Sequence, residues 1–561
     1  MNSNSTSRPS TEINNSRQRN LKELLQAWDE VVAGTALPQP PAYTGPDVTL
    51  SRLVEHTEDV APGTAFVARV REASDGHPYI PQAIEKGASV IIGQRAPEDL
   101  SAPLPERVPY LQVPDTAVAL AWLSAAWEAF PSRELVVVGV TGTDGKTTTC
   151  NILYELMHAG GLRAGLLSTV RAVIGEVEEP LGLHVSTPEA PVVQRLLRRM
   201  VDAGLTHCIL EATSHGLAQH RVGAVDFDVA VVTNITHEHL DYHGSYEAYF
   251  EAKARLFRYL TALSRIEAPQ EPENPFKRQI VKTAVLNIDD DSYPKLLTVP
   301  APRHMTYGIV RPADIAAEDI RESETGSTFM LHLPTGDRSV TLPLPGLFNV
   351  YNALAAATSA SALGLSPDVI RDGLQALSTV PGRMERIEEG QPFLVIVDFA
   401  HTPNGLEQLL NTARAMAGPS SRIITVAGSA GKRDVAKRRM LAEIAARDAD
   451  YVVLTAEDPR TEPVQEILEM MAESCIKAGA VEGETFWRIP DRGRAIYHAL
   501  SLAQPKDIVL ICGKGHEQSM CFGTTEYPWD ERQATRAALQ ALREGKPAPD
   551  LGLPTYGEAE G

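Results

Sequence analysis

A glycine-rich segment, GTDGKTTT (142–149), follows the apolar run LVVVGV and precedes a helical pattern. Its glycines allow backbone N–H groups to turn inward around an anion, and the N-terminus of the following helix adds partial positive charge. Lys146 can then reach the β- and γ-phosphates of a nucleotide, and the Thr147 hydroxyl can ligate Mg²⁺. Val140 stands where the strict spacing requires glycine, so the loop is a variant, and the alternative is a turn with a solvated lysine. We predict a nucleotide site formed by Gly142, Thr143, Asp144, Gly145, Lys146, Thr147 and Thr148.

Acidic and imidazole residues follow two further apolar runs. Glu211 ends the run THCIL, and the segment HEHLDYHG (237–244) comes shortly after DVAVVT. If these runs are adjacent parallel strands, their C-terminal ends meet at the edge of the sheet where ligands bind. Glu211 and His239 are therefore candidate metal ligands, although a segment of this composition is equally often a solvated turn.

A lysine on an apolar helix face follows that segment. In YEAYFEAKARLFRYL, Lys253 has Tyr249 and Phe250 one turn before it and Leu256 and Phe257 one turn after it. Burying an unpaired ammonium is unfavourable, so such a lysine becomes neutral, finds a partner or is modified. A neutral amine can add CO₂ to give a carbamate, which offers two oxygens to a cation. The spacing equally allows a lysine whose stem lies on the core while its ammonium reaches solvent.

The elements that would position these residues alternate between short apolar runs and helical patterns, which is typical of parallel sheets covered by helices. A first series of strands spans 135–287, and a second begins after Pro381 and resembles a Rossmann-like domain. We predict an α/β protein with a small mixed α/β N-terminal domain, a central parallel-sheet domain that carries the phosphate loop, and a C-terminal Rossmann-like domain. The predicted boundaries are 1–40 for a disordered tail and a helix, 41–132, 133–380 and 381–545 for the domains, and 546–561 for a loose tail.

Composition limits the class of protein. The chain has 561 residues and a net charge of 52 − 72 = −20, so binding to nucleic acid or to an anionic membrane through overall charge is not expected. The five cysteines form no CxxC pair, which fits a reducing compartment. The sequence contains no apolar run long enough to span a membrane, and its first twenty residues lack the apolar core of a secretory signal. We expect a cytoplasmic protein, without membrane insertion, that is a monomer.

Several motifs together resemble the Mur ligase superfamily, the ATP-dependent amide-forming enzymes of peptidoglycan synthesis, and within it the tripeptide synthetases that add the third peptide residue. The resemblance runs from about Val48 to about Leu542. Its motifs, in order, are GTDGKTTT (142–149), STPEA (186–190), EATSHGLAQHRV (211–222), TNITHEHLDYHG (233–244) with Lys253, GLFNVYNALAA (346–356), PGRME (381–385), VDFAHTPNG (397–405), GKRDVAKR (431–438), EDPRTE (457–462) and GKGHE (513–517).

The resemblance implies three domains, which bind the uridine nucleotide, ATP and the incoming amino acid. It also implies that Lys253 carries the carbamate, a choice that the spacing alone leaves open. The residues implied for the UDP-N-acetylmuramoyl-dipeptide are Thr57, Ser186, Thr187, Thr213, Gln219 and Arg221. Asn349, Arg383 and His401 are implied around ATP, and Arg433, Asp458, Pro459, Arg460, Gly513 and Glu517 around the amino acid.

The chemistry implied by the resemblance is phosphorylation of a peptide carboxylate by ATP, followed by attack of an amine on the acyl phosphate. Carboxylate and γ-phosphate repel each other, so cations must bridge them. Thr147 and Glu211 suit one Mg²⁺ ion, His239 and carbamylated Lys253 suit a second, and Lys146 would neutralise the transferred group. The alternatives are another ligase of the superfamily, such as a folate polyglutamylating enzyme, and a nucleotide-binding regulator without catalysis.

Three departures from the family pattern bear on specificity. His56-Thr57-Glu58 replaces an Asp-Ser-Arg near the uracil, Glu238 replaces an aspartate, and Glu457-Asp458-Pro459-Arg460 replaces Asp-Asn-Pro-Arg. In relatives that use meso-diaminopimelate, the asparagine helps to hold the distal carboxylate. Asp458 at that position would repel a carboxylate and attract an ammonium. We therefore expect a diamino acid, with L-lysine or L-ornithine favoured over meso-diaminopimelate.

Overall fold

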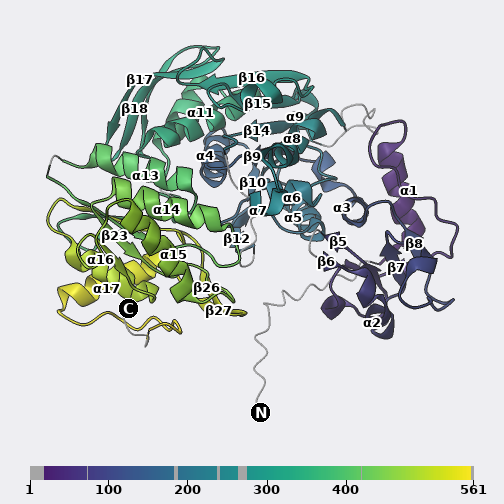
Figure 1. Cartoon of the computed structure of the whole chain (residues 1–561). Helices are drawn as coiled ribbons and strands as arrows, with labels where there is room; N and C mark the ends of the chain where they lie inside the picture. The colour runs from purple at the N-terminus through teal and green to yellow at the C-terminus, as the bar shows by residue number, and fades with distance from the viewer. Residues whose placement is uncertain are drawn as a thin grey trace.

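The structure is a computed structural model that describes residues 18–71, 74–181, 187–236, 240–262, 274–378, 380–418 and 420–556. The predictions for Ser186 and His239, and for disorder in the first residues, lie outside the described residues. Figure 1 shows α1 (Leu21–Val32) on one side of the molecule, the strands and helices of the middle of the chain at its centre, and the C-terminal part on the other side.

A four-stranded parallel sheet forms the core of the N-terminal part. Its strands in order are β3 (Arg52–Val54), β4 (Thr64–Val67), β7 (Val90–Gly93) and β8 (Tyr110–Gln112), and its helices include α2 (Ile80–Glu85) and α3 (Thr116–Trp127). Helix α1 (Leu21–Val32), which the sequence placed in a separate leading segment, packs into this core instead. The reason is its apolar face: Trp28 stacks on Trp122 with ring centroids 5.9 Å apart.

An eleven-stranded sheet spans the central part. Its strands in spatial order are β12 (Val177–Glu179), β11 (Ala172–Ile174), β10 (Ala164–Leu167), β13 (His207–Glu211), β9 (Val136–Thr141), β14 (Val229–Val232), β15 (Thr283–Asn287), β16 (Arg303–Gly308), β17 (Ile315–Ser323), β18 (Gly326–His332) and β19 (Arg338–Leu342). The strands from β10 to β17 are parallel, and the outer strands are antiparallel. The strand β9 that leads into the phosphate loop therefore lies between β13 and β14. The runs THCIL and DVAVVT were expected to be neighbouring strands; each pairs with β9 instead, and both still end beside the phosphate loop.

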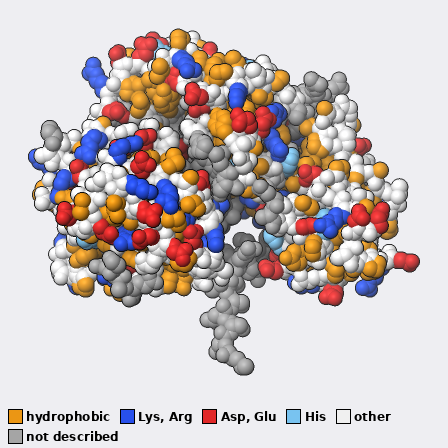
Figure 2. All heavy atoms as spheres, in the orientation of Figure 1, with side chains coloured by type: hydrophobic (Ala, Val, Ile, Leu, Met, Phe, Trp, Pro, Cys, Tyr) orange, Lys and Arg blue, Asp and Glu red, His pale blue; other side chains and the backbone are white. Residues whose placement is uncertain are grey.

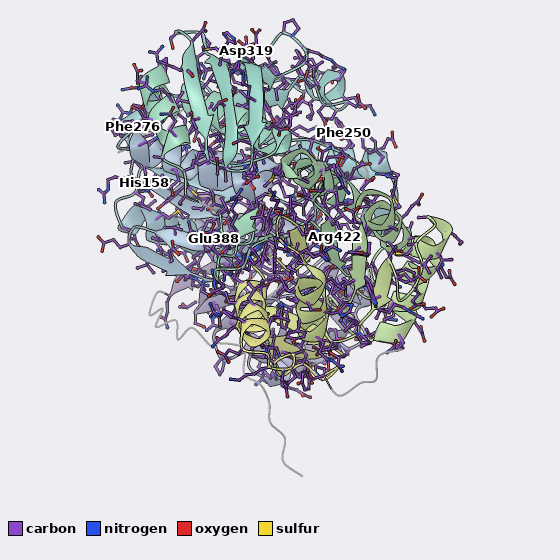
Figure 3. The ribbon with its side chains drawn as sticks, turned by 90° about the vertical axis from the view of Figure 1, so that its left-hand side faces the viewer. His158, Phe250, Phe276, Asp319, Glu388 and Arg422 are labelled. Carbon is purple, nitrogen blue, oxygen red and sulfur yellow. The ribbon has the colours of Figure 1, made fainter. Side chains whose placement is uncertain are left out.

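Helices cover both faces of this sheet. One apolar cluster joins it to α4 (Lys146–Ala159), α11 (Leu347–Ala362) and α12 (Pro367–Gln375), and a second joins it to α5 (Ala190–Asp202) and α8 (Tyr246–Ala262). Strands β16 and β17 were not predicted, because polar residues interrupt their apolar pattern. The hairpin predicted between 326 and 344 is present as β18 and β19. Figure 3 shows these antiparallel strands, with Asp319, at the end remote from Arg422.

The C-terminal part contains a six-stranded sheet whose order shows crossovers typical of a Rossmann-like domain. In space its strands are β20 (Glu385–Arg386), β21 (Leu394–Asp398), β25 (Ile508–Cys512), β22 (Ile423–Ala427), β23 (Tyr451–Leu454) and β24 (Phe486–Arg488). Only the β20–β21 pair is antiparallel. Helices α13 (Pro403–Met416), α14 (Val435–Asp448) and α15 (Val464–Lys477) cover one face, and α16 (Arg492–Leu502) and α17 (Glu531–Arg543) cover the other.

The segment after Lys546, which its Gly and Pro content predicted to be a loose tail, packs against this domain as far as Tyr556. Leu553 joins the apolar cluster beneath α16 and α17. The Thr555 hydroxyl is buried and donates to Asp491 at 3.1 Å. The prediction is wrong here because two side chains anchor an otherwise irregular backbone.

All five cysteines are free and buried. No helix within the described ranges is long and apolar enough to cross a membrane. On the face shown in Figure 2, acidic and basic side chains are interspersed over the C-terminal domain.

Candidate active site

The phosphate loop connects the end of β9 to the start of α4, where the sequence predicted it. Gly142 and Gly145 have positive φ angles of 151° and 81°. A Cβ atom on Gly142 would lie 1.8 Å from Thr233 Oγ1, and one on Gly145 would lie 2.2 Å from Asn352 Oδ1. A larger residue at either position would therefore clash with Thr233 or Asn352 and displace the loop from the end of β14 or from α11.

A hydroxyl and a carboxylate meet at the start of α4. The Thr147 hydroxyl lies 3.1 and 3.0 Å from the two Glu211 carboxylate oxygens, and the Thr169 N–H donates to the same carboxylate at 2.9 Å. Both side chains are buried. Hydroxyl and carboxylate oxygens are ligands that Mg²⁺ accepts, together with phosphate oxygens and water. Within the described part of the chain, no three His, Cys, Asp or Glu side chains are grouped so that they could hold a metal ion by themselves.

Lys146 is half-buried and lies inside the loop. Its ammonium donates to the Thr143 carbonyl at 2.8 Å. That contact is within the loop itself, so Lys146 contributes little to joining one element to another.

Lys253 is 1% exposed, so its ammonium does not reach solvent. Its Nζ donates to the Gly142 carbonyl and lies 4.5 Å from the centre of the Tyr249 ring. The neighbours Tyr249, Phe250, Leu256 and Phe257 are all buried, as their spacing indicated. The Tyr249 hydroxyl in turn lies 2.9 Å from Thr143 Oγ1. Lys253 therefore lies directly behind the phosphate loop, in a setting where a charged amine is costly.

Residues assigned to the peptide substrate surround the end of β13. The Thr187 hydroxyl donates to the Glu211 carbonyl at 3.0 Å and lies 3.1 Å from Thr213 Oγ1. Arg221 donates to the Thr187 carbonyl at 2.6 Å and pairs with Glu189 at 2.9 Å. Gln219 Oε1 accepts from the Arg221 guanidinium at 2.9 Å. These contacts bring four of the predicted residues together beside Glu211.

The first domain meets this group through charged side chains. Arg69 is buried between Glu55 and Glu189, at 3.5 and 3.9 Å. Thr57, which the sequence assigned to the nucleotide, does not line the cleft, whereas His56 does. The Thr57 carbonyl accepts from Lys86 at 2.7 Å at the start of a short 3-10 helix. In this loop it is therefore the side chain of His56, and not that of its neighbour Thr57, that faces the cleft.

Side chains of the third domain close over the phosphate loop. Arg383 donates to the Thr147 hydroxyl at 3.2 Å and lies 4.6 Å above the Phe399 ring. Asn404 and Thr402, at the start of α13, donate to the Asp144 carboxylate at 2.9 and 3.0 Å. The loop thus lies at the contact between two separate α/β units.

The predicted amino-acid residues gather at the C-terminal ends of β23 and β25. Asp458 is 5% exposed, and its Oδ1 accepts from Lys514 Nζ at 2.9 Å and from the Cys521 N–H at 3.0 Å. Lys514 is fully buried and also pairs with Glu517. Arg460, in the left-handed region at φ 54°, donates to the Gly431 carbonyl at 3.3 Å.

Sequence reasoning missed two charged residues of this group. Lys514 lies within the GKGHE motif, and Glu457 within EDPRTE, but spacing does not tell which side chain of a motif faces inward. Glu457 is buried at the cleft wall, and burial is the largest cause that raises its pKa to about 7, with a further contribution from Asp458. A Cβ atom on Gly513 would lie 2.8 Å from Glu457 Oε2, so glycine leaves room for this carboxylate.

One cleft of about 2280 Å³ joins these groups. Gly142, Lys253, Thr57 and Pro459 are described but do not line it. The predicted residues that line it are Thr143, Asp144, Gly145, Lys146, Thr147, Thr148, Thr187, Glu211, Thr213, Gln219, Arg221, Asn349, Arg383, His401, Arg433, Asp458, Arg460, Gly513 and Glu517. The phosphate loop and the Asp458–Lys514 pair therefore face a common space.

Comparison with protein families gives three matches along the chain. Residues 57–128 match a sequence model described as "Mur ligase family, catalytic domain", residues 140–360 the "Mur ligase middle domain", and residues 382–515 the "Mur ligase, glutamate ligase domain".

Two curated proteins match this chain over nearly all of their own length. A UDP-N-acetylmuramyl-tripeptide synthetase of Roseiflexus sp. (strain RS-1) is 44% identical over 90% of this chain and 97% of its own. A UDP-N-acetylmuramoyl-L-alanyl-D-glutamate–2,6-diaminopimelate ligase of Geobacillus thermodenitrificans (strain NG80-2) is 40% identical over 89% of this chain and 97% of its own.

Solved structures share the fold. A UDP-N-acetylmuramoyl-L-alanyl-D-glutamate–2,6-diaminopimelate ligase matches with a TM-score of 0.58 at 30% identity, covering 88% of this chain and 95% of its own. The ADP complex of a MurF ligase from Thermotoga maritima matches with a TM-score of 0.56 at 20% identity, covering 88% and 97%.

Proposed function

Since this chain belongs to the Mur ligase family, and is thus an ATP-dependent ligase that adds an amino acid to a UDP-N-acetylmuramoyl peptide, we propose that it adds a diamino acid to UDP-N-acetylmuramoyl-L-alanyl-D-glutamate through an acyl phosphate. The observation that carries this proposal is the single cleft shared by the phosphate loop, the Thr187–Arg221 group and the Asp458–Lys514 pair. The proposed functional division is 41–132 for the uridine nucleotide, 133–380 for ATP and 381–545 for the amino acid, with α1 added to the first domain and the residues up to Tyr556 added to the third.

The residues beside the phosphate loop have proposed roles that follow from their chemistry. Lys146 would neutralise the γ-phosphate, and the Thr147 hydroxyl and Glu211 carboxylate would hold Mg²⁺ against the phosphates. Arg383, which donates to Thr147, would add positive charge from the third domain. His239 and a carbamate on Lys253 would hold a second Mg²⁺; such ions supply charge neutralisation between the phosphate and the peptide carboxylate.

Direct turnover tests the proposal. UDP-N-acetylmuramoyl-L-alanyl-D-glutamate and ATP are supplied with each diamino acid, and ADP, phosphate and the amide product are measured together. Stoichiometric formation of all three supports the function. ATP hydrolysis with no amide product from any diamino acid would contradict it. A folate polyglutamylating activity, the alternative within the superfamily, is tested in the same assay with a folate acceptor.

We infer that the preferred amino acid is L-lysine or L-ornithine. The carboxyl groups that line the amino-acid end of the cleft would attract a distal ammonium; they belong to Glu457, Asp458 and Glu517. Arg433, Lys437 and Arg460 also line the cleft and oppose this attraction in part. Lys514 and the Cys521 N–H already compensate part of the Asp458 charge. We therefore expect a preference of roughly tenfold over meso-diaminopimelate, measured as kcat/KM, rather than the several-hundredfold that an uncompensated carboxylate would give.

The matched variant for this preference is Asp458→Asn, which keeps the size of the side chain and removes its charge. It should reduce the preference for the basic amino acids. A clear preference for meso-diaminopimelate that Asp458→Asn leaves unchanged would show that Arg460 and Arg433 dominate recognition. L-Lysine and L-ornithine differ by one methylene, and their ratio reports the depth of the pocket.

The raised pKa of Glu457, about 7, predicts a pH dependence of amino-acid binding. Below that pKa the carboxyl group is protonated and neutral; above it the carboxylate attracts a cationic amino acid. The KM for the diamino acid should therefore fall by about threefold to tenfold between about pH 6 and pH 8. Glu457→Gln should flatten this dependence while the KM for ATP stays unchanged. An equal pH dependence in wild type and Glu457→Gln would exclude Glu457 as its source.

A further inference from the structure

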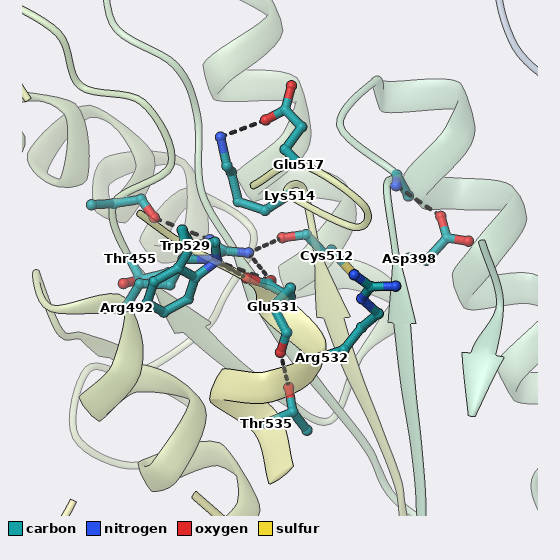
Figure 4. Close-up of polar contacts among 12 residues, drawn as sticks. Asp398, Thr455, Arg492, Cys512, Lys514, Glu517, Trp529, Glu531, Arg532 and Thr535 are labelled. Carbon is teal, nitrogen blue, oxygen red and sulfur yellow. Dashed lines mark hydrogen bonds and ion pairs between the residues drawn. The ribbon is translucent and has the colours of Figure 1, made fainter. Parts of the chain in front are cut away.

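A buried ion pair lies behind the amino-acid end of the cleft, between two helix starts. Arg492 is the first residue of α16 and Glu531 the first of α17, and both are 0% exposed. Arg492 Nε donates to Glu531 Oε2 at 2.9 Å, and the Trp529 indole N–H donates to the same oxygen at 2.6 Å. Neither Arg492 nor Glu531 lines the cleft. The pair is shown in Figure 4.

The remaining donors of Arg492 bind two backbone carbonyls. Nη1 donates to the Ala456 carbonyl at 3.0 Å, and Nη2 to the Cys512 carbonyl at 2.6 Å. Ala456 directly precedes Glu457 and Asp458, and Cys512 directly precedes Gly513 and Lys514. One guanidinium therefore holds the starts of both segments that carry the amino-acid residues.

The two segments do not belong to neighbouring strands. Strand β22 lies between β23 and β25 in the sheet, so their ends are separated by about 10 Å, two strand spacings. At the end of β22 the chain has Gly428, where a Cβ atom would lie 2.6 Å from the Thr455 carbonyl oxygen and 3.0 Å from Glu457 Cβ. The glycine lets the segment after β23 pass across the end of β22, and Arg492 joins this segment to the one after β25.

We propose that the Arg492–Glu531 pair is a positioning device for the incoming amino acid, because it fixes the separation between the 457–460 and 513–517 segments. The inference rests on the proposed function of those segments. The planar guanidinium makes this possible, since it binds a carboxylate and two carbonyls in fixed directions. A lysine would keep the charge, but its donors are on a single nitrogen, which cannot reach all three acceptors in these directions.

The energetics of buried pairs support a positioning role. A buried ion pair is seldom more stabilising than apolar residues of the same volume, so its presence is weak evidence for stability alone. Arg492 is also the foremost opposing charge that lowers the pKa of Glu457 against burial; Lys437 and Lys514 act in the same sense, and Asp458 in the opposite one. Arg492 thus influences the cleft both through backbone geometry and through charge.

The test is steady-state kinetics of the full chain with Arg492→Lys and Glu531→Gln. We expect the KM for the diamino acid to rise by roughly tenfold to a hundredfold, since small displacements of binding groups have effects of this size. The KM values for ATP and for the UDP-muramoyl peptide should change less than about twofold. Arg492→Met should in addition move the pH dependence of the amino-acid KM to higher pH in a way that Arg492→Lys does not, because only the former removes the charge.

A matched control exists in the same sheet, at the opposite ends of strands β22 and β25. Arg422 donates to Asp507 at 3.0 Å and to the Leu502 carbonyl at 2.9 Å, and thus joins strand starts away from the cleft. Arg422→Lys should lower the thermal stability without a selective effect on the amino-acid KM.

Three results would overturn the inference. The first is an unchanged amino-acid KM in a folded Arg492→Lys or Glu531→Gln variant, and the second is an equal rise in all three KM values. The third is failure of both variants to fold while Arg422→Lys folds, which would make the pair purely structural. Failure of the proposed function is distinct, because the wild-type protein would then form no amide product.

Discussion

Lys146→Ala is expected to lower amide formation by at least about a hundredfold to a thousandfold, the effect of removing one preorganised positive group from a developing charge. The physical reason is that Lys146 provides a mobile cation inside the phosphate loop, where ATP would bring several negative charges. Among the described residues, the side chain of Lys146 has one hydrogen bond, to the Thr143 carbonyl in the same loop. The loss should therefore be one of rate and not of folding.

The measurement is release of ADP and amide product, with thermal unfolding recorded for the same preparations. Lys477→Ala serves as the control, since Lys477 is exposed in the last turn of α15 and does not line the cleft. It should behave like the wild type. Near-normal turnover in a folded Lys146→Ala variant would remove the basis for assigning the γ-phosphate to this lysine.

Lys253→Ala is expected to lose activity by at least about a hundredfold, and acetate should restore part of it. The reason is the position of Lys253: its ammonium is buried behind the phosphate loop, where a carbamate would turn a cation into an anionic ligand for Mg²⁺. A free carboxylate can enter the space left by the lysine stem. Lys253→Glu should remain poorly active, because its carboxylate is held nearer the backbone than a carbamate would be.

Two measurements separate this explanation from a general packing effect. Acetate should not restore Lys146→Ala, which loses a cation and not an anionic ligand. Intact mass and ¹³C NMR after exposure to labelled bicarbonate should show one added CO₂ in the wild type and none in Lys253→Ala. An unmodified Lys253 in fully active protein would refute the carbamate.

The parts of the fold that follow from local sequence were predicted well. Strands β9, β13 and β14 are continuous apolar runs because both faces are buried, and such runs identify parallel strands without knowledge of their partners. The helical face around Lys253 is likewise a property of spacing, so its burial could be anticipated. The direction of the Lys253 ammonium could not, because it depends on the Gly142 carbonyl from a strand end 111 residues away.

In the third domain, the motifs predicted the amino-acid site but not the contacts within it. EDPRTE and GKGHE indicated an amino-acid site, yet neither spacing nor composition reveals that Lys514 pairs with Asp458 across 56 residues of chain. That pair changes the expected discrimination against a second carboxylate. The same limit explains Thr57, whose neighbour His56 lines the cleft instead.

The sequence by itself determined the phosphate loop, the alternation of buried strands and helices, and the order of the motifs, because each depends on residues close together in the chain. Only the tertiary structure decided that the loop touches Asn404 and Thr402 of another domain, that α1 and the residues up to Tyr556 belong to domain cores, and that Arg492 joins two strand ends. These contacts join segments far apart in sequence. Their geometry depends on how whole sheets and helices pack, which no local pattern encodes.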